Sequence, residues 1–137
     1  PLLYTGCDSG GRMKDIPAGT TDEMVIDTTP DMGVKHLPIP MYSTPAMVAH
    51  IEGLCLKMLI PFQEAGETSV GYRVEVKHTA PTPIGMKVTV KGRVKEQDGR
   101  KVVFEVQAYN ETGAQIGEGS HERRVIDSSR FAGAPKA

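Results

Sequence analysis

PAMVAHIEGLCLKMLIPF, residues 45–62, is the stretch that decides the fold, because only here do apolar residues return at helical spacing over a long segment. The recurring residues are Met47, Val48, Ile51, Leu54, Cys55, Met58 and Leu59. Ser43 or Thr44 can cap the first turn, and Pro45 suits the first helical position because its missing N–H would have no partner there. Pro61 is expected to end the helix.

The opposite face of this predicted helix carries the small residues Ala49 and Gly53, where an exposed helix would carry a charged stripe. We therefore expect the helix to be enclosed on more than one side. A sheet that wraps around it would provide this enclosure.

The segments around the helix alternate between apolar and polar residues, which is the period of a β-strand. One strand is expected before the helix and four after it, at residues 23–28, 72–79, 86–95, 102–108 and 114–126. Asp98-Gly99 predicts a hairpin turn, and Gly117 and Gly119 predict bends or bulges in the last strand. The expected order is strand, helix, and then four strands in an antiparallel meander.

This order predicts an α+β fold, a curved antiparallel sheet wrapped around one central α-helix. Because one helix covers only one sheet face, we expect a homodimer with its active site between the subunits. The length of 137 residues suits a single domain. Residues 1–19, rich in glycine and polar types, are expected to be a flexible leader that contains a candidate start at Met13, and residues 20–137 are expected to form the domain.

The composition excludes several classes of partner. Sixteen Lys and Arg residues against seventeen Asp and Glu residues give a formal net charge of -1, too small to gather nucleic acid or an anionic membrane. No apolar run of eighteen residues and no signal leader is found, so a cytoplasmic location is expected. Cys7 and Cys55 lie in different settings without a CxxC pair, so neither a disulfide nor a metal site is predicted.

Three side chains are candidates for chemistry. His78 is in phase with Tyr72, Val74 and Val76, so its imidazole points inward as a base near neutrality or as a ring satisfied by a backbone carbonyl. Glu52 lies at the edge of the apolar helix stripe and is either a border carboxylate or a paired inward one.

Thr44 is a helix cap that can also serve catalysis, whereas His50 and His121 are expected to be structural or at the surface. The sequence lacks a GxSxG elbow, a phosphate-binding glycine loop and an HExxH motif. Any chemistry must therefore use threonine, glutamate and histidine.

The stretch from Thr44 to Ile126 resembles the fluoroacetyl-CoA thioesterase family of hotdog-fold proteins. The residues that carry the resemblance are Thr44, the helix pattern Met47-Val48 through Glu52, TSVG ending at Gly71, His78-Thr79-Ala80 with Thr82-Pro83 and Gly85, and GEGSHER from 117 to 123. The resemblance implies a single hotdog domain that hydrolyses an acyl-CoA or similar thioester without a metal or bound cofactor.

In that family, the matching residues imply a catalytic set of Thr44, Glu52 and His78, with Gly71 in the wall of the active site. His78 would shuttle the proton that the departing thiolate needs. Glu52 would either orient His78 or attack the carbonyl itself, and Thr44 would hold the carbonyl, the water or the carboxylate. The sequence leaves these roles open.

Two other functions compete with hydrolysis. A non-catalytic acyl-CoA or hydrophobic-ligand binder would keep the fold and the pocket without turnover. An enoyl-CoA hydratase of hotdog type would also use an acid–base site between subunits, but the Asp and His spacing expected of such a hydratase is not evident here.

The segment from Leu37 to Ser43 is short and contains no phenylalanine, whereas the resemblance implies a Phe-rich lid there. We therefore predict an open acyl pocket that discriminates little between acyl groups. Hydrolysis rates for fluoroacetyl-CoA, acetyl-CoA and longer acyl-CoAs should be similar in a free-thiol release assay. A strong preference for fluoroacetyl-CoA would refute this prediction.

Overall fold

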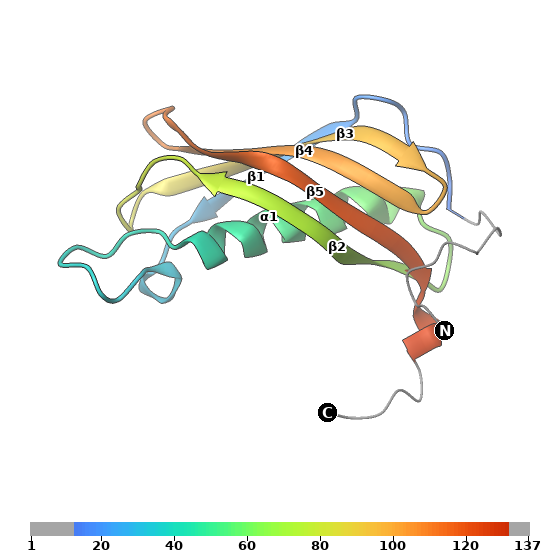
Figure 1. Ribbon diagram of the computed structural model, residues 1–137, viewed down its shortest axis with the longest axis horizontal. Coiled ribbons are helices and arrows are strands. Elements are labelled where there is room, and N and C mark those ends of the chain that lie inside the picture. The colour runs from blue at the N-terminus through green and yellow to red at the C-terminus, as the bar shows by residue number, and fades with distance from the viewer. Residues whose placement is uncertain (1–12, 132–137) are drawn as a thin grey trace.

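The computed structural model describes residues 13–131, which form a five-stranded antiparallel sheet with one α-helix lying across it (Figure 1). The elements are β1 Thr21–Asp27, η1 Pro30–Met32, α1 Thr44–Leu59, η2 Ile60–Phe62, β2 Glu67–His78, β3 Lys87–Asp98, β4 Lys101–Asn110, β5 Gln115–Asp127 and η3 Ser128–Phe131. The α+β hotdog fold expected from the sequence is confirmed.

Helix α1 begins where the capping residues predict. Ser43 is the N-cap, and its side-chain oxygen accepts a hydrogen bond from the backbone N–H of Ala46 at 3.2 Å. The α-helix ends at Leu59, two residues before Pro61 and within the turn that the sequence predicts, and continues as the 3-10 turn η2. Pro61 explains this change, because proline cannot donate the next helical hydrogen bond and its ring would crowd the preceding turn.

The core lies between α1 and the concave face of the sheet. The buried helix residues are Met47, Ile51, Leu54, Cys55, Met58 and Leu59, and they pack with Val88, Val90, Phe104 and Val106 of the sheet. A Cβ atom at Gly92 would come within 3.0 Å of Met58 Sδ, so glycine lets the helix approach β3 closely.

The strand order is β1-β3-β4-β5-β2, which corrects the predicted four-strand meander. Strands β3, β4 and β5 do form a meander, but β2 lies beside β5 and not beside β3. The connection at residues 79–86 spans the intervening strands, a distance of about 14 Å at ordinary strand spacing. Alternation in the sequence defines the two faces of a strand but not its neighbour, and this is why the pairing was missed.

Strand β2 is an edge strand with a β-bulge between Gly71 and Arg73. The extra residue, Tyr72, is 51% exposed, and the guanidinium of Arg124 lies over its ring at 4.1 Å. Val74 is 37% exposed. The bulge interrupts the alternation, so the prediction that Tyr72 shares an inward face with Val74, Val76 and His78 was wrong for Tyr72.

Part of the predicted flexible leader belongs to the packed domain. Met13 and Ile16 are buried in the core. The N–H of Lys14 donates to the carbonyl of Phe62 at 2.8 Å, and that of Ile16 donates to Gln97 Oε1 at 2.8 Å. The expected boundary at residue 20 is therefore too late, while residues 1–12, Cys7 among them, lie outside the described part of the chain.

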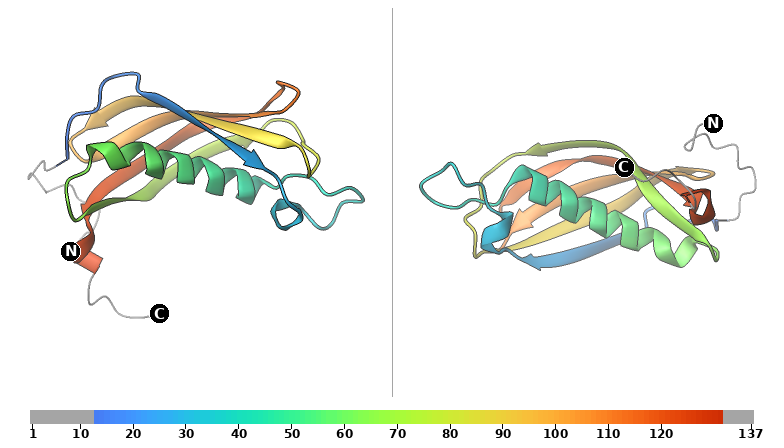
Figure 2. Two further views of the ribbon diagram at one scale, coloured as in Figure 1. Left: turned by 180° about the vertical axis from the view of Figure 1, so that it is seen from behind. Right: turned by 90° about the horizontal axis from the view of Figure 1, so that it is seen from below.

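The outer side of α1 is not enclosed as its composition predicts (Figure 2). Leu56 of α1 is 38% exposed, and Ile60, the first residue of η2, is 59% exposed. The sheet covers only the opposite side of the helix (Figure 2). Residues Thr44–Phe62 are long and apolar enough to meet the length and composition of a membrane span. Packing against the sheet accounts for the buried third of this segment.

Candidate functional site

The end of β2 meets the start of α1 at a hydrogen bond between Thr44 and His78. Thr44 Oγ1 and His78 Nδ1 are 2.8 Å apart. His78 is the last residue of β2, and the next residue, Thr79, is fixed by an N–H donated to the carbonyl of Ile116 at 2.7 Å. Two of the three predicted catalytic side chains are therefore in direct contact.

The surroundings of His78 favour a neutral imidazole. Burial lowers the pKa of His78, and the backbone of Ala80 acts weakly in the opposite direction. The Nε2 atom is buried and has no hydrogen-bond partner of good geometry among the described residues. A neutral ring with one free nitrogen can accept a proton from a substrate or a water molecule.

Tyr42 is a buried residue that contacts both His50 and His78 at this end of the site. Its hydroxyl is 2.5 Å from His50 Nδ1, and its ring meets that of His78 edge to face with centroids 6.3 Å apart. Only 1% of Tyr42 is exposed. His50 thus has the structural role that the sequence predicts, as the partner of a buried phenol.

Glu52 lies at a second location, against Gly71 of β2. An added Cβ atom on Gly71 would be 2.5 Å from Glu52 Oε2, so only glycine leaves room for the carboxylate. Glu52 is eight residues from Thr44, a separation of about 12 Å along a helix. The expected contact between Glu52 and His78 does not form within one protomer, because Glu52 points to a different part of β2.

A buried polar network that sequence reasoning did not single out lies behind Gly71. Arg123 donates from Nε to Ser69 Oγ at 2.8 Å and from Nη2 to the carbonyl of Ser69 at 2.9 Å. Arg123 Nη1 and His121 Nε2 are 3.2 Å apart. His121 was expected to be structural or at the surface, and it is fully buried. The available signal was the phase of β5, where His121 and Arg123 fall on the same strand face as the core residue Val125.

The loop before Thr44 projects beyond the end of the sheet (Figure 1). It is closed by a bridge between Gly33 and Tyr42 and by the N–H of Val34 donating to the carbonyl of Met41 at 2.9 Å. Leu37 and Ile39 at its tip are 45% and 58% exposed. These two side chains are therefore largely open to solvent, and the open acyl pocket remains a prediction.

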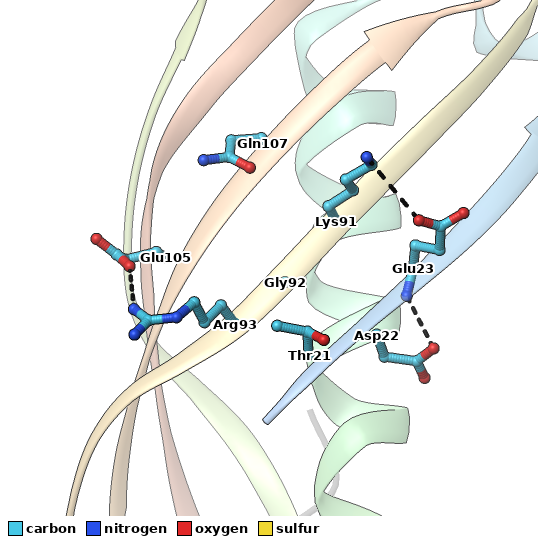
Figure 3. Close-up of a pocket in the computed structure, with 8 residues that line it drawn as sticks. All are labelled: Thr21, Asp22, Glu23, Lys91, Gly92, Arg93, Glu105 and Gln107. Atoms are coloured by element: carbon cyan, nitrogen blue, oxygen red, sulfur yellow. Dashed lines mark hydrogen bonds and ion pairs between the residues drawn. The ribbon is translucent and has the colours of Figure 1, made fainter. Parts of the chain in front are cut away.

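A shallow pocket of about 390 Å³ lies on the other face of the sheet (Figure 3). Its charged groups satisfy one another: Arg93 and Glu105 are 2.7 Å apart, and Lys91 and Glu23 are 4.0 Å apart. This pocket is separated from Thr44 and His78 by the sheet. In residues 13–131, no group of three or more His, Cys, Asp or Glu side chains is arranged to hold a metal ion.

Comparison with known proteins places the chain in a class and then in a family. A hypothetical protein of Thermus thermophilus, a thioesterase superfamily member, superposes with a TM-score of 0.82 at 35% identity, over 88% of this chain and 90% of that one. A variant of the fluoroacetyl-CoA-specific thioesterase FlK in complex with fluoroacetate and CoA superposes with a TM-score of 0.77 at 32% identity, over 85% and 99% of the chains. The fold therefore defines a hotdog protein of the thioesterase superfamily.

Residues 20–129 match the family described as FlK, fluoroacetyl-CoA-specific thioesterase. The fluoroacetyl-CoA thioesterase of Streptantibioticus cattleyicolor is 37% identical over 91 residues, which are 66% of this chain. The match spans 65% of that relative, slightly less than two thirds of its length. The chain belongs to the fluoroacetyl-CoA-specific thioesterase family, as the resemblance implied.

The buried histidines predict a stability that falls in mild acid. Burial lowers the pKa of His50, His78 and His121 below the ordinary histidine value of 6.5. The unfolded chain then binds more protons than the folded chain as the pH falls through about 6.5, so the free energy of unfolding decreases from pH 7.5 to pH 5.5. Urea unfolding at the two pH values measures this change. Equal or greater stability at pH 5.5 would contradict the assignment of neutral buried rings.

Proposed function

We propose that this chain hydrolyses an acyl-CoA to the free acid and CoA, at a site built by two copies of the chain. The observation that carries the proposal is the Thr44–His78 hydrogen bond at the end of an exposed edge strand. Membership of the thioesterase family supports the reaction, and the relative bound to fluoroacetate and CoA supports the substrate class. The cytoplasmic location and the absence of nucleic acid and membrane partners remain predictions.

The β2 edge supports a homodimer. It has twelve residues with an outer edge that pairs with no strand of the described chain, and Tyr72 and Val74 expose apolar surface along it. A long unpaired edge is a template for another strand. Two-fold pairing of β2 with its own copy would join the two sheets and use the same surface on both subunits.

The positions of the site residues along β2 suit this pairing. An antiparallel pair centred between Val74 and Glu75 would put His78 opposite Gly71 of the partner subunit. Because Glu52 lies against Gly71, its carboxylate would then approach the unpartnered Nε2 of His78 across the interface. One active site would thus combine Thr44 and His78 of one subunit with Glu52 of the partner subunit.

Hydrolysis adds water across the carbonyl–sulfur bond of the thioester. Attack on the carbonyl carbon forms a C–O bond, the C–S bond breaks, and the CoA thiolate takes a proton. Neutral His78 can accept the proton of the attacking water and return it to the sulfur. Thr44 holds Nδ1 of this ring in place. Glu52 either orients the ring or attacks the carbonyl carbon itself, which expels the thiolate and forms a transient anhydride that water cleaves to the acid and free Glu52.

Isotope labelling detects attack by Glu52 when the resulting anhydride is hydrolysed at the Glu52 carbonyl. In a single turnover in water enriched in oxygen-18, direct attack by water places the label in the acid product and none in Glu52. Attack by Glu52 followed by hydrolysis of the anhydride at the acyl carbonyl leaves the label in the acid, whereas hydrolysis at the Glu52 carbonyl transfers it to Glu52. Mass spectrometry of the peptide containing residue 52 measures this incorporation.

Mixed dimers test the shared site. His78→Ala and Glu52→Gln should each reduce kcat by at least about a hundredfold, since each removes one part of both sites. After subunit exchange, half of the dimers are mixed and each contains one intact site, so about a quarter of wild-type activity should return. Exchange is verified with differently tagged chains. Inactive mixed dimers would contradict a site shared between subunits.

The two sheet edges offer a matched test of assembly. Val74→Glu on β2 should give a monomer with little activity, because a charge at the expected interface opposes pairing. Val25→Glu on β1, which is 57% exposed on the other edge strand, is the control and should remain a dimer. Light scattering coupled to size-exclusion chromatography gives the mass of each variant. A dimeric Val74→Glu variant with full activity would refute the β2 interface.

A further inference from the structure

The buried network behind Gly71 contains a cation that the proposed reaction does not use. Arg123 is only 5% exposed, and three of its nitrogens are bonded or close to Ser69 and His121. Burying a guanidinium is costly unless it is hydrogen-bonded and faces an opposite charge. Ser69 and His121 meet the first requirement.

His121 connects this cation to the β-bulge. Its Nδ1 is 2.8 Å from the carbonyl oxygen of Arg73, the residue that follows the bulged Tyr72. A carbonyl can only accept, so Nδ1 carries the proton, and Nε2 of the neutral ring accepts from Arg123 Nη1. Burial also lowers the pKa of His121, which agrees with a neutral ring. The imidazole therefore bridges the bulge backbone and the guanidinium.

The opposite charge that faces the guanidinium belongs to Glu52. The point where a Cβ atom of Gly71 would lie is 2.5 Å from Glu52 Oε2, 3.4 Å from His121 Cε1 and 3.6 Å from Arg123 Nη1. The carboxylate, the imidazole and the guanidinium therefore converge on one glycine. Glu122, the other acidic residue nearby on β5, is bonded to Arg124 at 2.8 Å.

We infer that Ser69, His121 and Arg123 are positioning residues that hold the bulge at Gly71 and aim the carboxylate of Glu52 at the interface. The inference rests on the proposed function and deepens it, because it explains how the half-buried carboxylate of Glu52 keeps one orientation. Arginine suits the position since its planar fork can bond Ser69 Oγ, the Ser69 carbonyl and His121 at once. A lysine ammonium could not reach all three acceptors in that arrangement.

Two substitutions test the network. His121→Phe keeps the ring volume and removes both hydrogen bonds, and Arg123→Lys keeps the charge and removes the fork. Each should lower kcat by about 10- to 100-fold, because a small misplacement of a reacting group can cost about a hundredfold, with KM changed less than about threefold. Arg93→Lys, an exposed arginine on the opposite sheet face, is the matched control and should retain wild-type kcat.

Coupling to Glu52 distinguishes positioning from a general structural effect. If the network acts through Glu52, His121→Phe should cost little further activity in a Glu52→Gln background, so the two effects are not additive. Full additivity, or wild-type kcat in both His121→Phe and Arg123→Lys, would overturn the inference. Wild-type activity of Glu52→Gln would instead overturn the proposed function.

Rescue provides a readout that does not depend on a stable His121 variant. Guanidinium ion at millimolar concentration should restore part of the kcat of Arg123→Ala by occupying the vacated fork, and sodium ion at equal strength should not. Ser69→Ala is the milder variant if others unfold, and circular dichroism confirms folding. Absence of rescue in folded Arg123→Ala would count against a positioning role for the guanidinium.

Discussion

The packing of α1 across the concave face of the sheet is the constraint on which the rest of the structure depends. The helix buries its apolar stripe in the core. Its rotation about its own axis is therefore set by Met47, Ile51, Leu54 and Met58. This rotation directs Thr44 and Glu52 toward β2, but the length of two helical turns keeps them about 12 Å apart. In one protomer, the two parts of the proposed site therefore lie apart, with Thr44 and His78 at one position along β2 and Glu52 at another.

In the proposed function, the complete site forms only when two copies of the chain pair along the β2 edge. His78 lies at the end of the strand and Gly71 seven residues before it, on either side of the exposed middle of the edge. An antiparallel copy reverses the direction of the strand and so exchanges the two positions. The edge that exposes apolar surface in the protomer therefore also carries both parts of the proposed site.

Sequence patterns predicted the elements better than their arrangement. The helix from its Ser43 or Thr44 cap and the strands from period-two alternation are confirmed, since both depend on local spacing. The neighbour of β2 and the bulge at Tyr72 depend on contacts with β5 that lie about fifty residues away. The resemblance named Thr44 and His78, and the structure shows them hydrogen-bonded, whereas the location of Glu52 and the contacts of Arg123 depend on packing that local patterns do not describe.

The side chains of His78 and Glu52, the two parts of the proposed site, are held in place by different interactions. At His78, burial without a charged neighbour favours the neutral ring, and Thr44 and Tyr42 fix its orientation. At Glu52, a hydrogen-bonded guanidinium faces the carboxylate across a glycine. The residues that fix one group are therefore not those that fix the other. Each group can be positioned by its own neighbours within the protomer, and in the proposed dimer the pairing of β2 with its copy is the step that brings the two together.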